Sequence, residues 1–326
     1  MDKVADVVKS YNHNVKLYKY VLPLLILFCT ACRDDGQKRA HPDVSGVEAE
    51  VEIFRFQEAL YQIDPANFGQ QAKELHAQHP IFFDCYLQML RIPKDTATMY
   101  RKLQDRLQFG GMRAAFDSMQ LKYADIPDLQ QNLVQGMKYT HHYFPELPEP
   151  SVYTFTSEYG YGVVACSDSV YGIGLDLFLG RDFTFYPAVE IPAYLLPRLE
   201  RPYIVPNFFR QYFTQFFPEP ATQEMLDKMM YRAKIIYLTE QVLPEVEDHF
   251  IINYTEPEME WAQEHEGEIW AFLLGEELLY ETSTFTYRKY LEEGPGTPGL
   301  PHEAPAKIAV WSGWQIVRQF MNENPD

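Results

Sequence analysis

Residues 152–179, VYTFTSEYGYGVVACSDSVYGIGLDLFL, decide the fold of this 326-residue chain. The segments 152–156, 161–165 and 171–179 are rich in β-branched and aromatic residues, which favour β-strands. Residues typical of turns occupy 157–160 and 167–169 between these segments. The stretch therefore predicts three short strands that form a small sheet in the middle of the chain.

Helical patterns flank this sheet on both sides. Apolar residues recur at helical spacing there, and prolines or paired glycines interrupt the pattern. The predicted helices are 47–63, 68–79, 81–90, 95–109, 112–124 and 128–143 before the sheet, and 207–217, 221–238, 256–279 and 311–321 after it. This order predicts a single α+β domain over 47–326 that is mostly helical, with a small β-sheet in the middle.

The order of elements resembles the zincin type of zinc peptidase, in which a helix after a small sheet carries His-Glu-x-x-His. The zinc motif itself is missing. Segment 207–217 (NFFRQYFTQFF) contains neither His nor Glu, and Ile269 stands where a second histidine would follow His265. His76 and His79 could share a helix face, but the sequence suggests no third ligand. We therefore predict a zincin-like outline without the zinc motif, no metal site and no cofactor.

Sequence motifs for other kinds of catalysis are also missing. There is no Gly-x-Ser-x-Gly nucleophile elbow. Cys166 has no context typical of a cysteine protease, and we interpret it as a small buried residue. Gly172 and Gly174 are not followed by the third glycine and the helix of a dinucleotide-binding motif. The sequence predicts that the protein is not an enzyme, and the alternative is a divergent zinc metallopeptidase-like enzyme with ligands outside the usual motif.

The N-terminal segment has the features of a bacterial lipoprotein signal. Residues 21–32 (VLPLLILFCTAC) form an apolar run that four lysines precede. The run is shorter than the roughly 20 residues that cross a bilayer as a helix. We therefore predict a signal peptide at 1–31, lipid attachment at Cys32 and a polar, flexible tether at 32–46. Asp34 and Asp35 resemble the acidic signal that sends lipoproteins of the Bacteroidota to the outer membrane or the cell surface.

The predicted mature chain is strongly acidic. Segment 1–31 contains four Lys and two Asp, so its removal changes the formal net charge from −18 to −18 − 2 = −20. A charge of this sign argues against nucleic acid as a partner and is compatible with a basic protein or a divalent cation. Only Cys85 and Cys166 remain in the domain, and the sequence leaves open whether they pair or stay free thiols.

The segment from 240 to 293 contains fifteen acidic residues and only two Lys or Arg. Within it, Glu256, Glu260, Glu264 and Glu268 recur every four residues, which places like charges above one another on a helix. Each such pair costs about 0.2–0.5 kcal/mol. The series is interpreted either as a solvated helix face or as a partner-binding ridge that docks a basic protein or collects a divalent cation.

Several short motifs stand in a fixed order along the chain: 53–56 (IFRF) in the first predicted helix, 79–84 (HPIFFD), 138–139 (KY), 143–145 (YFP), 150–153 (PSVY), 173–180 (IGLDLFLG) and 311–318 (WSGWQIVR). Together they resemble the gliding motility lipoprotein GldB family of the Bacteroidota. The resemblance implies a lipid-anchored protein of the cell envelope, with protein partners in the motility machinery and no established enzymatic activity.

Taken together, these features predict a lipid-anchored, non-enzymatic component of the gliding motility or linked secretion machinery at the outer membrane. Its contact with the membrane is expected through the N-terminal lipid, and nucleic acid is not expected as a partner. A second alternative is a surface lipoprotein that binds glycan or peptide on exposed aromatic residues such as Tyr159, Tyr161 and Tyr186.

Overall fold

The structure, a computed structural model, describes residues 41–94 and 98–324. The predicted signal peptide, Cys32 and the rest of the predicted tether up to residue 40 lie outside the described residues. From Asp43 onward the chain forms one compact unit. The prediction of a mostly helical fold with a small sheet in the middle is confirmed.

The sheet is mixed and has four strands. Its strand order is β1 (Glu52–Arg55), β2 (Ser151–Phe155), β4 (Val170–Gly174) and β3 (Val163–Ala165). β1 and β4 both pair in parallel with β2, whereas β3 runs antiparallel to β4. The three predicted strands are confirmed, but the last one ends at Gly174 and continues as the 3₁₀ helix η2 (Leu175–Phe178).

The predicted helix at 47–63 is wrong over much of its length. Residues 52–55 form β1, and only α2 (Phe56–Tyr61) is helical. In β1, Ile53 lies opposite Val152 and Arg55 lies opposite Thr154. A partner strand that is remote in the sequence therefore supplies the backbone hydrogen bonds, and this tertiary pairing overrides the local pattern.

Most of the other predicted helices are present with small shifts at their ends. The helices before β2 are α3 (Phe68–Gln78), α4 (Pro80–Met89), α5 (Met99–Gln108), α6 (Gly110–Lys122) and α7 (Pro127–Tyr143). Those after β4 are α8 (Ile204–Phe216), α9 (Met225–Val242), α10 (Asp248–Ile252), α11 (Glu256–Glu264), α12 (Glu266–Gly275), α13 (Thr284–Leu291) and α14 (Ile308–Glu323).

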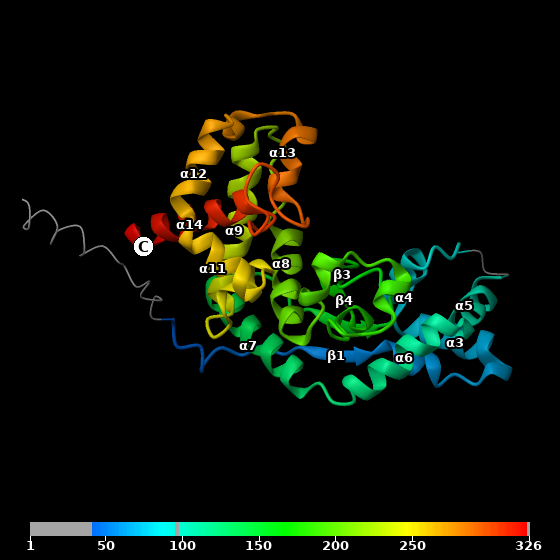
Figure 1. The fold of residues 1–326 in the computed structure, drawn as a ribbon. Coiled ribbons are helices and arrows are strands. Elements are labelled where there is room, and N and C mark those ends of the chain that lie inside the picture. Colours follow the sequence, from blue (N-terminus) through cyan, green and yellow to red (C-terminus); the bar gives the residue numbers. More distant parts are fainter. Residues whose placement is uncertain (1–40, 95–97, 325–326) are drawn as a thin grey trace, which may run out of the picture. The chain divides into compact units, whose positions relative to one another are not determined.

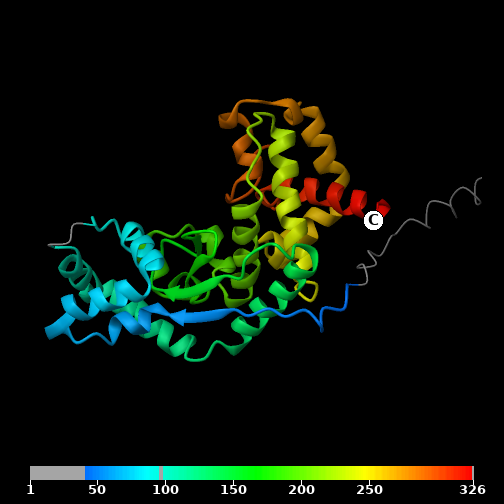
Figure 2. The ribbon, with the colours of Figure 1, turned by 180° about the vertical axis from the view of Figure 1, so that it is seen from behind.

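The helices gather at two ends of the sheet. Figures 1 and 2 show α3 to α6 on one side, and α9, α12, α13 and α14 on the other, with α8 next to the sheet. The buried apolar residues correspondingly form two clusters. The smaller cluster joins α2 to α5 and Met112 of α6 with part of the sheet, and the larger one joins the sheet with the rest of α6 and the helices from α7 to α14. Both clusters thus include residues of the sheet and of α6.

The helix predicted over 256–279 is interrupted at His265. This residue ends α11 and precedes α12, with φ −113° and ψ 20°. Its ring stacks on Trp261, with centroids 4.3 Å apart, and its Nδ1 donates to the Trp261 carbonyl at 2.8 Å. Gly267, the second residue of α12, has a low helix propensity. The acidic series is consequently divided between two helices.

A disulfide joins Cys85 of α4 to Cys166, which follows β3. The two Cα atoms are 5.7 Å apart, within the usual range for a disulfide. The sequence left open whether these two cysteines pair. They do so because α4 packs against the sheet and brings them together.

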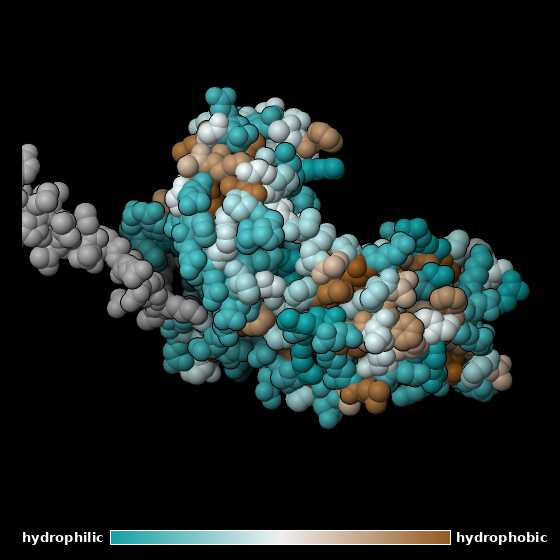
Figure 3. Space-filling view, viewed as in Figure 1, coloured by the Kyte–Doolittle hydropathy of each residue, from teal (hydrophilic) through white to brown (hydrophobic). Residues whose placement is uncertain are grey.

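Over the described residues, no helix is both long and apolar enough to cross a membrane. The face seen in Figure 3 is mostly hydrophilic, with separate apolar patches.

Candidate functional site: a cationic cavity

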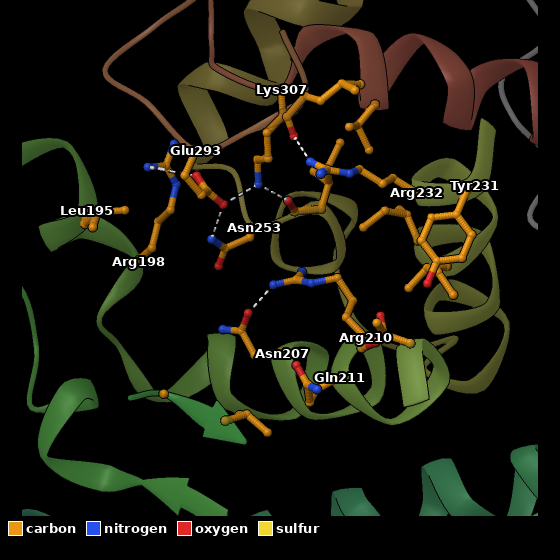
Figure 4. Close-up of a pocket in the computed structure, with 18 of the residues that line it drawn as sticks. Leu195, Arg198, Asn207, Arg210, Gln211, Tyr231, Arg232, Asn253, Glu293 and Lys307 are labelled. Atoms are coloured by element: carbon orange, nitrogen blue, oxygen red, sulfur yellow. Dashed lines mark hydrogen bonds and ion pairs between the residues drawn. The ribbon is translucent and has the colours of Figure 1, made fainter. Parts of the chain in front are cut away.

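A cavity of about 780 Å³ lies between α8, α9, the residues before α14 and the 3₁₀ helix η4 (Ala193–Arg198). This volume falls within the range of roughly 300–1,000 Å³ that is usual for ligand pockets. Much of its wall is apolar and includes Leu177, Phe178, Leu195, Leu199, Ile236 and Ile252. Figure 4 shows polar side chains that reach its interior from several elements.

The charged residues of the wall are mostly basic. Four basic side chains and two carboxylates line the cavity: Arg198, Arg210, Arg232, Lys307, Glu219 and Glu293. In the whole chain the balance is the reverse, with 46 Asp and Glu against 28 Lys and Arg. The cavity is therefore a local concentration of positive charge inside an acidic protein.

Arg198 occupies the last position of η4, and only 2% of its side chain is exposed. Its Nη2 donates to Glu258 of α11 at 2.6 Å, and its Nη1 donates to the Tyr194 carbonyl at 2.8 Å. Glu293 lies further away, 3.9 Å from Nη1. The Nε of Arg198 is buried and has no hydrogen-bond partner. One donor of this guanidinium is thus unused.

Lys307 directly precedes α14 and has a left-handed backbone, with φ 55°. Its Nζ donates to Glu293 Oε1 at 2.6 Å and to the Ile252 carbonyl at 2.8 Å, and it lies over the ring of Tyr254. Burial lowers the pKa of Lys307 to about 8, although Glu293 opposes this shift. The ammonium is therefore held in a site that disfavours its charge.

Glu293 is the carboxylate that faces the cations. Burial alone would raise its pKa, but the attraction of Lys307 and Arg198, with hydrogen bonds from Lys307 and Asn253, holds the pKa below its usual value. Protein atoms surround this side chain, yet 36% of it remains accessible because it borders the cavity. Glu293 therefore stays ionised. Its closest cation is Lys307, which is hydrogen-bonded to it, whereas Arg198 is further away.

Arg210, from the middle of α8, makes no ion pair with a carboxylate of the described residues. It donates instead to neutral oxygens: the Ile251 and Phe250 carbonyls and the side chain of Asn207. Burial lowers its pKa to about 10, against a weaker opposite effect of Glu293. Figure 4 shows Arg210 on the far side of the cavity from Lys307 and Glu293. Within residues 41–94 and 98–324, its positive charge thus has no ion-pair partner.

Asn253 completes the polar part of the wall. It follows α10 in a left-handed conformation, with φ 64°. Its Nδ2 donates to Glu293 at 3.0 Å, whereas its Oδ1 is buried without a hydrogen-bond partner. The cavity wall thus contains an unused acceptor as well as the unused donor of Arg198.

The sheet side of the cavity is held in place by Asp176. This buried carboxylate accepts from the backbone N–H of Ser157 and Tyr159 at 2.8 and 2.9 Å, and from the Ser157 hydroxyl at 2.9 Å. Burial raises its pKa to about 6 despite these bonds. Gly174 lies beside the same loop, where an added Cβ would be 2.1 Å from the Tyr161 carbonyl oxygen. Close backbone approach therefore requires glycine here.

The residues singled out from the sequence lie elsewhere. Glu256, Glu260 and Glu264 are exposed on α11, and Glu268 is exposed on α12 beyond the break. None of the four lines the cavity. Glu258 of the same helix turns toward the protein instead and pairs with Arg198.

The histidines considered as ligands have other partners. His76 contacts Asp84 and Tyr100 at 3.0 and 2.9 Å, and His79 contacts Tyr153 at 3.1 Å. Among residues 41–94 and 98–324, no three His, Cys, Asp or Glu side chains are grouped so that they could hold a metal ion.

Three tyrosines were expected to be exposed and to bind glycan or peptide, and this expectation of exposure is wrong for two of them. Tyr159 and Tyr186 are buried, and only Tyr161 is exposed. The Tyr186 hydroxyl donates to the Asp176 carbonyl at 3.1 Å, and the Tyr159 ring packs edge-on against the Tyr186 ring. These rings fill the core beneath the loop after β2, and they offer no binding platform.

Fold and site together define a class of protein: a mostly helical domain with a small mixed sheet, a disulfide and a cavity whose charged residues are mostly cations. The particular family follows from the sequence. The family model described as gliding motility protein GldB matches residues 37–326, and the chain belongs to this family of gliding motility lipoproteins, which is not a known enzyme family. No curated protein and no solved structure matches the chain.

The cavity residues were missed by sequence reasoning for a simple reason. Arg198, Arg210, Asn253, Glu293 and Lys307 come from five separate segments, and no short spacing links them. The one local signal is the motif 173–180, which carries part of the family resemblance and supplies Leu177 and Phe178 to the wall.

Proposed function

We propose that the protein is a lipid-anchored component of the cell envelope that serves the gliding motility or linked secretion machinery by binding a partner, without catalysis. The observation that carries this proposal is the match to the GldB family over residues 37–326. The proposed anchor is the lipid on Cys32, and the proposed location is the outer membrane, at its periplasmic or surface face.

The disulfide gives independent support for export. Disulfides persist in oxidising compartments such as the bacterial periplasm and are rare in the cytosol. The Cys85–Cys166 bridge is the kind of feature expected of an envelope protein. The acidic pair Asp34 and Asp35 supports the outer membrane as the destination.

Gene deletion tests the proposed role. The deletion strain should lose gliding on agar or, in a bacterium that does not glide, should secrete less protein through the linked machinery. The wild-type gene should restore the trait, and the Cys32→Ala gene should restore it poorly because its product is released from the membrane. Normal gliding and normal secretion in the deletion strain would contradict the proposal.

A zincin-like scaffold that lacks its metal is the finer structural proposal. On α8, the helix that follows the sheet, Asn207 and Gln211 are four residues apart and both line the cavity. Two histidines at such positions could reach one zinc ion, whereas two amides are poor zinc ligands. Elemental analysis of the untagged chain 33–326, before and after chelation, should find no bound zinc. One zinc per chain would favour the divergent metallopeptidase.

The exposed glutamates of α11 are proposed as a docking surface for a basic partner in the envelope. The variant Glu260→Gln/Glu264→Gln should recover less partner from crosslinked envelopes than the wild type. The matched control is Glu276→Gln/Glu277→Gln, which removes the same charge from two other exposed positions. Equal recovery with both variants would make the acidic face a solvated surface only.

A further inference from the structure

Arg210 is the one cation of the described cavity wall that forms no ion pair with a carboxylate. Lys307 pairs with Glu293, Arg198 with Glu258, and Arg232 with Glu292 at 2.8 Å. Glu219, the other carboxylate of the wall, pairs with Lys228 at 3.4 Å. Arg210 is the remaining cation, and its partners among the described residues are neutral oxygens. A charge held inside a protein without a counterion is costly, and a monoanion entering the cavity would remove that cost. A phosphate monoester carries about −1.5 to −2, which is more than the single unpaired charge of Arg210.

Two buried polar atoms of the wall have opposite requirements. The Nε of Arg198, on a side chain only 2% exposed, is a donor without an acceptor. The Oδ1 of Asn253 is an acceptor without a donor. An unsatisfied buried group of this kind costs about 1–3 kcal/mol. A ligand that completes the wall must therefore offer an acceptor and an N–H or O–H donor in addition to its negative charge.

The geometry points to the cavity as a binding site for the C-terminal end of a peptide whose last side chain is apolar. A terminal carboxylate is a monoanion with acceptor oxygens for Arg210 and Arg198, and the adjoining amide N–H is a donor for Asn253. Leu195, Leu199 and Ile236 supply the apolar part of the wall for the last side chain. Capture of a terminal carboxylate is an established mode of peptide recognition.

A peptide fits this wall better than a fatty acid does. A fatty acid would satisfy the charge and the apolar surface, but it has no N–H for Asn253. The wall also contains the side chains of Asn207, Gln211 and Thr214, which can bond to peptide groups and not to an alkyl chain. This inference rests on the proposed binding role and names the chemistry of its partner.

Matched peptides test the inference. The probes are two mixtures of N-acetylated tripeptides that end in Leu, Ile, Val, Phe or Met, one with free carboxylates and the other with C-terminal amides. Thermal unfolding and calorimetric titration of the mature protein report binding. The free acids should raise the melting temperature and bind at least about tenfold more tightly than the amides, because a charge-assisted hydrogen bond contributes about 1.5–3 kcal/mol. Octanoate and inorganic phosphate serve as competing probes.

Variants assign the binding to the cavity. Arg210→Gln should weaken binding of the free acids by about 10- to 100-fold. Lys234→Gln is its matched control, because this exposed residue of α9 lies outside the cavity wall. Asn253→Gly keeps the left-handed backbone and removes the amide, so it should cost about three- to tenfold in affinity. This second variant keeps the test decisive where Arg210→Gln fails to fold.

Several results would overturn the inference. These are equal binding of acids and amides, no binding of either at millimolar concentration, tighter binding of octanoate or phosphate than of the free acids, and an unchanged affinity in Asn253→Gly. Any of them would leave the anchoring and motility experiments unaffected, so a failure here is distinguishable from a failure of the proposed function.

Discussion

Removal of the disulfide should destabilise the domain strongly without preventing its folding. The bridge joins residues 81 apart in sequence. For a loop of this length, the chain-entropy relation gives a loss of about 15 cal/mol/K in the unfolded state, or about 4.5 kcal/mol at 25 °C. The bridge is not the only link between α4 and the sheet. The Phe82 ring stacks on Tyr153, with centroids 4.3 Å apart, so the Cys85→Ser/Cys166→Ser protein should keep its fold.

Urea unfolding of the mature chain measures this loss. We expect the free energy of unfolding to fall by about 2–4.5 kcal/mol in the double serine variant, since measured disulfide effects often lie below the entropic value. The wild type in strong reductant is the control and should match the variant. A difference under about 1 kcal/mol, or two reactive thiols in the native protein recovered from the envelope, would refute the reasoning from an exported, disulfide-bonded domain.

Three further changes have defined outcomes. Gly174→Ala should lower the free energy of unfolding by about 1–3 kcal/mol or more in urea, because its Cβ would lie 2.1 Å from the Tyr161 carbonyl oxygen; an unchanged midpoint would contradict the close approach. The pKa of Lys307 is about 8 in the fold and 10.5 in the unfolded chain, so the unfolded chain binds more protons between these values. The stability of the wild type relative to Lys307→Met should therefore rise by up to about 3 kcal/mol from pH 8 to 10.5, and a flat or falling difference would count against this pKa. Glu260→Gln/Glu264→Gln should raise stability by up to about 1 kcal/mol by removing two like-charge pairs of α11, whereas a clear loss would show that these glutamates have stabilising partners.

The strands that could be predicted were those with a strong local signal. Residues 152–156 are all β-branched or aromatic, and Tyr171 and Ile173 give the same signal in the next segment, so propensity and tertiary pairing agree. The strand at 52–55 was hidden because its pattern continues into α2, and its partner Ser151–Phe155 is distant in the sequence. The interruption at His265 depends on a stacked ring and a side-chain hydrogen bond, which spacing alone does not reveal.

The candidate site was beyond sequence reasoning for a related reason. The lipoprotein signal and the acidic series are local patterns, whereas the cavity is assembled by folding. Arg210 gave no signal in the sequence, since a single arginine in an aromatic helix is ordinary. Its meaning depends on the neutral oxygens that accept its hydrogen bonds, which only the fold brings to it. Unsatisfied atoms such as Asn253 Oδ1 can be recognised only once the packing is known.

The most direct measurement for a lipid-anchored protein of the gliding machinery is metabolic labelling with a palmitate analogue, followed by fractionation of the envelope. Wild-type protein should carry the label and sediment with the outer membrane. Cys32→Ala should be unlabelled and appear in the soluble fraction. An unlabelled wild type, or a Cys32→Ala protein that stays in the membrane fraction, would contradict anchoring through Cys32 and with it the proposed place of the domain in the envelope.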